Sequence, residues 1–147
     1  MKDIKNIEDY NIWACTDYTN NQDGFTRGSS NITLTSSHEW SVNGESCLKI
    51  ERTGDSTPTV DTTHLTNVTE NKTIQYSVTI LTKDVDVIIR VRGKGSYLTY
   101  VTVPSSPNAQ IVSLSAIIPS DYEYVCLRFA PQGYGFCHVD DITCTVT

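Results

Sequence analysis

The amino-acid sequence predicts an all-β fold, a β-sandwich or jelly roll built from two antiparallel sheets. Five segments alternate apolar and polar residues with a period of two, which is the pattern of half-buried strands. Turn-forming residues separate these segments, and strands recur at intervals of roughly 10–14 residues, a spacing typical of sandwiches and jelly rolls. No long stretch shows the 3.6-residue period of a helix, so we expect the chain to be built from strands.

The alternating segments, in chain order, are residues 32–35, 47–51, 74–80, 85–92 and 124–129. In the third of them, Ile74, Tyr76 and Val78 alternate with polar side chains. Successive side chains of a strand point to opposite faces. We therefore expect the apolar set of each segment in the core and the other set on the outer face of its sheet.

Glycine and proline mark the turns between these segments. Gly93 and Gly95 flank a lysine and are expected to form a hairpin turn, because glycine adopts positive φ without steric cost. Proline cannot donate a ladder hydrogen bond, and it occurs in the predicted turns at residues 104–108, 119–121 and 131–133. In the strand after the hairpin, Tyr97 and Tyr100 are three positions apart, so we expect them on opposite faces with at most one at the surface.

Length and charge limit the class of protein. The chain has 147 residues, which predicts a single β-sandwich domain over residues 1–147. Its apolar runs, such as residues 87–89, are far shorter than the roughly 20 residues of a membrane helix. A net charge of −6 argues against nucleic acid as a partner, because that binding is driven by basic surfaces. Residues 1–9 lack the apolar stretch of a signal peptide, so we expect none in this chain.

The cysteines leave two interpretations open. The chain has Cys15, Cys47, Cys126, Cys137 and Cys144. An odd number leaves at least one thiol free, and no CxxC spacing indicates structural zinc. The cysteines are either buried and reduced, acting as small apolar residues, or they form one or two disulfides in an exposed module.

Four stretches resemble segments of the β-jelly-roll carbohydrate-binding modules that accompany xylanases, of families 4, 9 and 22. They are residues 38–50 (HEWSVNGESCLKI), 73–80 (TIQYSVTI), 125–129 (VCLRF) and 138–143 (HVDDIT). The first resembles the family's turn that ends in glycine and leads into a Ser-x-Leu-Lys-Ile strand. The last resembles its closing Asp-Asp strand. The resemblance implies a jelly roll that binds sugars on a concave sheet and has no catalytic activity.

Sugar binding requires aromatic rings against the C–H faces of the sugar and planar polar groups for its hydroxyls. The outward positions of the alternating strands carry such side chains. Two further aromatic residues, one in the 38–50 stretch and one after residues 131–133, are candidates for the same role. The predicted ligand-binding residues are Trp40, Gln75, Arg90, Arg92, Tyr124, Arg128 and Tyr134.

The three arginines of this set have two interpretations. Clustered on one face, Arg90, Arg92 and Arg128 could pair with carboxylates or sulfates of an acidic glycan. Alternatively, they are solubilising charges on an exposed sheet, paired with Asp86 or Glu123.

The resemblance also implies a structural calcium ion at the closing aspartates. Calcium takes six to eight oxygen ligands, which a carboxylate at a strand end and nearby loop carbonyls supply. Asp140 and Asp141 are the predicted metal ligands, with Glu8 or Asp9 as a second source of oxygen. The alternative is that the pair ends a strand and one carboxylate accepts backbone N–H bonds.

No catalytic centre is predicted. His38, His64 and His138 are scattered, and none stands next to a serine or cysteine in the setting of a nucleophile. Adjacent aspartates of a strand point to opposite faces, so Asp140 and Asp141 are not expected to flank one glycosidic bond.

The sequence thus predicts a non-catalytic carbohydrate-binding module that recognises a poly- or oligosaccharide. We expect it to be part of, or attached to, a larger extracellular or cell-surface protein, without nucleic acid as a partner and without membrane insertion. The alternative is a structural or protein-interaction jelly roll in a larger surface or phage-type assembly.

Overall fold

The computed structural model describes residues 25–28, 31–42, 47–55, 58–62, 64–66, 70–93 and 95–147, and the structural statements below concern these residues. In these ranges the chain forms ten strands and no helix. The strands are β1 (Phe25–Arg27), β2 (Ile32–Ser37), β3 (Cys47–Arg52), β4 (Val60–Thr62), β5 (Thr73–Leu81), β6 (Val87–Gly93), β7 (Ser96–Val103), β8 (Gln110–Ile117), β9 (Cys126–Pro131) and β10 (Gly135–Val146). Since the described part holds no helix at all, it also holds none long and apolar enough to cross a membrane.

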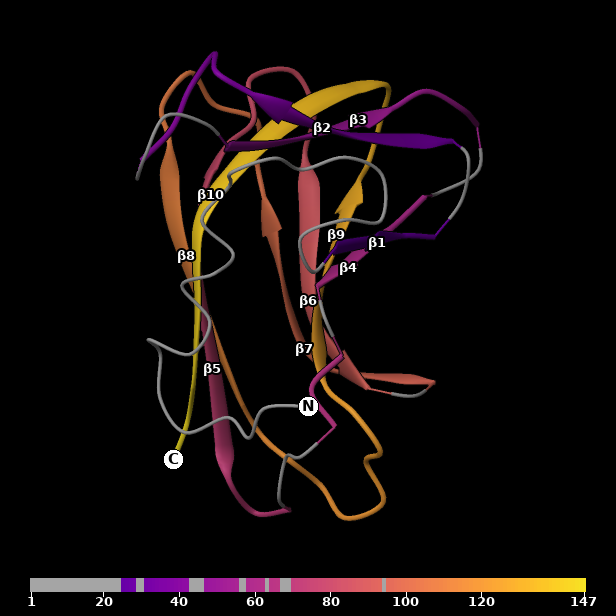
Figure 1. Cartoon of the computed structure of the whole chain (residues 1–147), viewed down its shortest axis with the longest axis vertical. Helices are drawn as coiled ribbons and strands as arrows, with labels where there is room; N and C mark the ends of the chain where they lie inside the picture. The colour runs from indigo at the N-terminus through magenta and orange to yellow at the C-terminus, as the bar shows by residue number, and fades with distance from the viewer. Residues whose placement is uncertain are drawn as a thin grey trace.

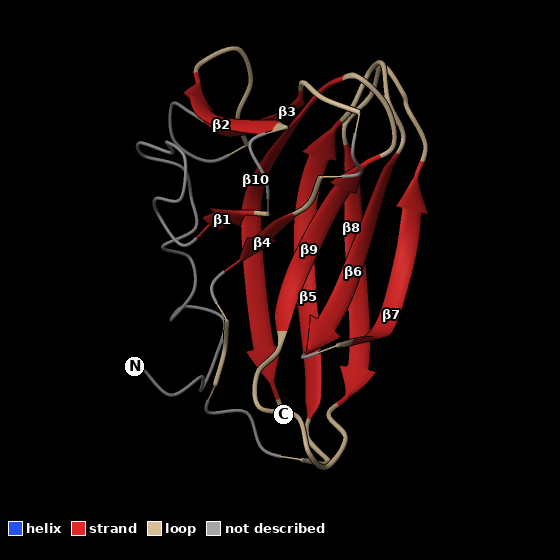
Figure 2. Ribbon diagram, turned by 90° about the vertical axis from the view of Figure 1, so that its right-hand side faces the viewer, coloured by secondary structure: helices blue, strands red, loops and turns tan. Residues whose placement is uncertain are grey.

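Two five-stranded antiparallel sheets pack face to face, as the sequence predicts. The front sheet has the order β1-β4-β9-β6-β7, and the back sheet has the order β2-β3-β10-β5-β8. Figure 1 shows the layers from the side, with β5, β8 and β10 in one and β6, β7 and β9 in the other. Figure 2 shows them after a 90° turn, with the front sheet nearer the viewer.

The core lies between the sheets and contains the apolar residues that the alternation selects. Ile74, Tyr76 and Val78 of β5 are fully buried, as are Ile89 of β6 and Phe129 of β9. Residues from both sheets belong to one hydrophobic cluster. Because full burial of a side chain of this size contributes roughly 1.5–3 kcal/mol, the strand faces are strongly specified.

The β6–β7 hairpin forms at Gly95, whose φ of 76° is the positive value expected there. The register of the hairpin shifts between Val91 and Arg92, which is a β-bulge. The extra residue brings Tyr97 opposite Arg92 while Tyr100 lies opposite Arg90. The expectation that the two tyrosines lie on opposite faces was therefore wrong, because a bulge breaks the period of two. Both are exposed, Tyr97 by 53% and Tyr100 by 66%.

A second register shift lies in β10, between Asp140 and Thr143 in its pairing with β5. Asp141 has a positive φ of 55° at this point. The strand continues beyond it to Val146, so the aspartate pair lies in the middle of a long strand rather than at its end.

The four cysteines in the described residues are free and buried: Cys47, Cys126, Cys137 and Cys144. This agrees with the buried, reduced interpretation for these four positions. Cys15 lies outside the described residues. Burial raises the pKa of the thiols of Cys126, Cys137 and Cys144 to about 12.

We expect iodoacetamide to leave these three thiols unmodified in the native protein at about pH 8, near the ordinary pKa of a free thiol. Only the thiolate reacts, and burial both suppresses the thiolate and blocks access to it. Peptide mapping by mass spectrometry after labelling measures the modification, and the urea-unfolded chain provides the fully reactive control. Substantial labelling of the native thiols would contradict the packing described above.

Candidate functional site

A row of polar and aromatic side chains crosses the outer face of the front sheet. Tyr100 of β7 lies opposite Arg90 of β6, Arg90 lies opposite Arg128 of β9, and Arg128 lies opposite Asp61 of β4. Directly paired residues of neighbouring strands point to the same face. A parallel row places Tyr97, Arg92 and Cys126 beside the first. We refer to these two rows as the arginine–tyrosine face.

Asp61 holds Arg128 in a two-point ion pair. The Arg128 Nε and Nη2 donate to the two carboxylate oxygens at 2.6 and 3.0 Å. The two side chains are 13% and 18% exposed, so the pair is largely shielded from water. The hydrogen bonds to Asp61 raise the pKa of Arg128 above its ordinary value. Asp86, which the sequence offered as a partner, instead accepts a hydrogen bond from the backbone of Ser105.

Two further groups approach the same carboxylate. The Arg92 Nη1 lies 3.9 Å and the His64 Nε2 lies 3.6 Å from Asp61 Oδ2. Asp61 is thus the hub that gathers Arg92 and Arg128. The sequence did not single it out, because β4 is only three residues long and shows no alternation of its own.

Arg90 is held differently from the other two arginines. Its guanidinium carbon lies 4.7 Å from the ring centroid of Tyr97, a cation–π contact across the hairpin. Within the described part of the chain no carboxylate lies within ion-pair distance of it.

Tyr124 lies at the edge of this face, against His64. The two rings stack with centroids 4.0 Å apart and planes within 1° of parallel. An isolated bridge between Leu65 and Val125 brings the two segments together. One face of the Tyr124 ring is therefore covered by the imidazole.

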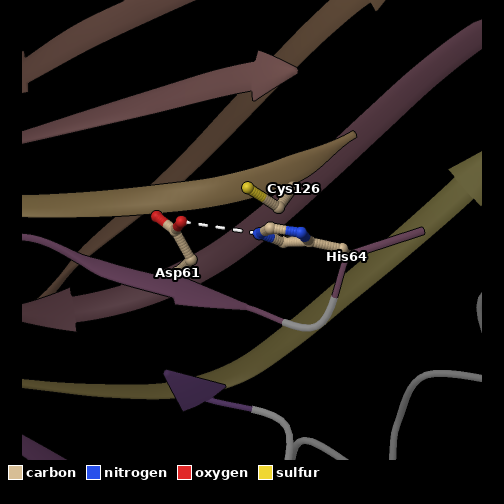
Figure 3. A group of neighbouring side chains, drawn as sticks. All are labelled: Asp61, His64 and Cys126. Atoms are coloured by element: carbon tan, nitrogen blue, oxygen red, sulfur yellow. Dashed lines mark ion pairs between the residues drawn. The ribbon is translucent and has the colours of Figure 1, made fainter. Parts of the chain in front are cut away.

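Asp61, His64 and Cys126 form the cluster drawn in Figure 3, with one donor atom from each within 4.8 Å of the others. A carboxylate, an imidazole and a thiolate are ligands that zinc uses. However, both oxygens of Asp61 already accept hydrogen bonds from Arg128, and burial and then Asp61 raise the pKa of the Cys126 thiol. The local electrostatics therefore favour guanidinium groups at this carboxylate over a metal ion.

The remaining predicted ligand-binding residues lie elsewhere. Gln75 is exposed on the outer face of the back sheet, between Ser115 and Thr145. Trp40 contacts His138 on the back-sheet side, with ring centroids 6.4 Å apart. Tyr134 lies in the β9–β10 connection near Arg52. The structure thus brings Arg90, Arg92, Arg128 and Tyr124 together and separates the other three from them.

The Trp40 segment borders a small pocket of about 180 Å³, lined by Glu39, Trp40, Leu81, Lys83, Phe136 and His138. His138 is buried in its wall, and burial lowers the pKa of its imidazole. Its Nε2 lies 3.7 Å from Glu39 Oε2. The pocket is therefore a mixed aromatic and charged site of small size.

Asp140 is buried and performs a structural role. Its Oδ2 accepts a hydrogen bond of 2.8 Å from the backbone N–H of Val42, which attaches the β2–β3 connection to β10. This agrees with the alternative in which one carboxylate accepts backbone N–H bonds. Glu8 and Asp9 lie outside the described residues. Calcium binding by Asp140 and Asp141 stays a prediction.

No family model and no curated protein matches the sequence. Solved structures do share its fold. A family 22 carbohydrate-binding module of Clostridium thermocellum xylanase 10B superposes with a TM-score of 0.65 at 14% identity, covering 92% of this chain and 94% of that one. The chain has the β-jelly-roll fold of the carbohydrate-binding modules. The CBM22-1–GH10 modules of the same xylanase, solved with xylohexaose, give a TM-score of 0.72 at 13% identity over 99% of this chain.

The jelly-roll fold of this chain is also shared by proteins with other roles. A Stig cyclase of Fischerella has a TM-score of 0.70 at 8% identity, with 99% of this chain and 98% of that chain covered. A tailspike protein of bacteriophage CBA120 has a TM-score of 0.67 at 10% identity over 84% of this chain. The chain spans only 19% of the tailspike chain and 29% of the xylanase chain. At these identities the likeness shows the fold alone.

Proposed function

We propose that the chain is a non-catalytic carbohydrate-binding module that holds a poly- or oligosaccharide across the arginine–tyrosine face. The observation that carries the proposal is the pair of exposed rings, Tyr97 and Tyr100, next to Arg90 on one face of the front sheet. Sugars offer C–H faces to aromatic rings and hydroxyls to planar polar groups. Both kinds of group lie side by side in this row.

The shared fold supports a sugar ligand and makes xylan the first candidate. Neighbouring structures include xylan-binding domains and a module solved with xylohexaose. In that xylanase the module is one part of a longer chain, and we propose the same for this chain, outside the cell or on its surface. An open sheet face buries little ligand area, so each site is expected to bind weakly and to act by local concentration.

A glycan array with the purified protein, in calcium and in EGTA, tests the function itself. Binding to a defined set of glycans supports the proposal, and loss of binding in EGTA supports calcium at Asp140 and Asp141. A folded protein that binds no glycan contradicts it.

Replacing Tyr100 by alanine is expected to weaken binding to the best glycan about tenfold, the equivalent of ~1.4 kcal/mol. The ring is 66% exposed, so its loss costs little stability and removes a stacking surface. Isothermal titration calorimetry measures the change. Tyr134→Ala is the matched control, since Tyr134 is also exposed but lies away from the arginine–tyrosine face. Equal effects of the two substitutions would contradict this placement of the ligand.

The second candidate is a structural jelly roll that contacts another protein. Strand β8 is an edge strand of the back sheet, and its Ile111 and Ile117 are 78% and 65% exposed. Exposed apolar residues on an edge strand favour protein association, and the tailspike likeness fits this role. Concentration-dependent mass in analytical ultracentrifugation, abolished by Ile111→Lys, would support it over sugar binding.

A further inference from the structure

The arginine–tyrosine face carries an excess of positive charge, although the chain as a whole has a net charge of −6. Of the side chains described on this face, Arg90, Arg92 and Arg128 are positive, and Asp61 is the carboxylate that meets them. Three guanidinium groups and one carboxylate leave two positive charges without an internal counterpart. A local excess of this kind is a feature that a ligand of opposite charge can use.

The single carboxylate is already committed. Asp61 gives both of its oxygens to Arg128 at hydrogen-bond distance, and Arg92 approaches one of them only to 3.9 Å. The Arg92 Nε donates instead to the carbonyl of Gly93. Arg128 therefore has a full partner, Arg92 has a partial one, and Arg90 has none among the described carboxylates.

Arg90 is at the same time held in place. Its guanidinium stacks on Tyr97 at 4.7 Å and lies directly opposite Arg128. Like charges directly opposite on neighbouring strands repel each other, and a bound anion would relieve this repulsion. A positioned guanidinium also loses less freedom on binding, and its fork suits the two oxygens of a carboxylate or sulfate.

We propose that this face recognises an acidic glycan, in which a carboxylate or sulfate oxyanion binds Arg90 and Arg92 while the adjacent sugar ring stacks on Tyr100. This inference rests on the proposed function, and it adds the class of the ligand and the residues that select it. The oxyanion chemistry is common to uronic acids and sulfated sugars. The exposed Tyr100 lies opposite Arg90 in the register, which places the ring and the charge side by side.

The test uses an array of neutral, uronic-acid and sulfated oligosaccharides on the same backbones, including xylohexaose and its glucuronic-acid and sulfate derivatives. We expect the acidic members to bind at least tenfold more tightly than their neutral counterparts. Raising the salt concentration should reduce this preference, because the charges on an open sheet are screened. Comparison of the uronic-acid and sulfated spots identifies the source of the oxyanion.

Arg90→Gln, compared with Lys72→Gln, assigns the preference to the face. Lys72 is exposed at the start of β5 in the back sheet, so its substitution makes the same change of net charge away from the site. We expect Arg90→Gln to weaken acidic ligands about tenfold and neutral ligands less than twofold, with Lys72→Gln unchanged.

The possible failures are distinguishable. A folded protein that binds no glycan overturns the proposed function together with this inference. Binding of neutral and acidic glycans with equal affinity overturns the inference alone. An acidic preference that survives Arg90→Gln also overturns it, because the oxyanion is then held elsewhere.

Discussion

Replacing Asp61 by asparagine is expected to lower the free energy of unfolding by about 2–3 kcal/mol. The carboxylate holds Arg128 by two hydrogen bonds and lies near Arg92, and these side chains are only 13–18% exposed. The amide keeps the shape but removes the negative charge, so two poorly hydrated guanidinium groups remain next to each other. The residual exposure keeps the expected loss below that of a fully buried pair. Urea unfolding, with an unchanged dependence on denaturant, measures it.

Asp86→Asn is the matched control for this prediction. Asp86 is exposed and accepts a hydrogen bond from Ser105, so its substitution is expected to cost less than about 0.5 kcal/mol. The double variant Asp61→Asn/Arg128→Gln should be less destabilised than the sum of the two single variants, because the pair is removed together. If Asp61→Asn cost no more than Asp86→Asn, the ion pair would not stabilise the fold, and its role as the hub of the face would be wrong.

Replacing Gly93 by alanine is expected to cost about 2–3 kcal/mol through overpacking. A Cβ at this position would overlap the ring atoms Cδ2 and Cε2 of Tyr122 and lie 2.7 Å from the backbone oxygen of Tyr124. The ring can turn aside, but the backbone oxygen moves only if the segment before β9 moves with it. Because Tyr124 lies at the edge of the arginine–tyrosine face, we also expect weaker glycan binding. Thermal unfolding and calorimetry measure the two effects.

Gly133→Ala provides the comparison for this second prediction. A Cβ at Gly133 meets one atom, a methyl of Val85, at an ordinary contact distance of 3.9 Å. Its substitution is expected to be neutral or to stabilise by a few tenths of a kcal/mol, since alanine restricts the unfolded chain. Similar losses for the two variants would show that the contacts of Gly93 with Tyr122 and Tyr124 are not what limits the site.

The fold was predictable from the sequence because each long strand carries its own signal. The period of two in residues 74–80 and 85–92 correctly placed Tyr76 and Ile89 in the core and Arg90 and Arg92 outside. This signal is local and depends on burial on one face of a sheet. It therefore gives the face of each strand with no knowledge of the strand's neighbours.

The candidate site was only partly predictable, for the same physical reason. Alternation does not say to which sheet a strand belongs, and so Gln75 of β5 was grouped with arginines that lie on the opposite layer. It does not register a bulge, which turned both Tyr97 and Tyr100 outward. It is silent on a strand of three residues, and Asp61 lies in one. Each miss concerns pairing between strands, which a single segment does not encode.

The arrangement of the arginine–tyrosine face has a consequence for how the protein folds. Asp61 and Arg128 are 67 residues apart in the chain, and Arg90 comes from a third strand between them. No local hairpin therefore contains the face, and it exists only once distant parts of the chain have met. Proteins dominated by such distant pairings fold slowly, over milliseconds to seconds. Ligand binding during refolding should accordingly appear in one late step, together with the native state, and no excised half of the chain should show it.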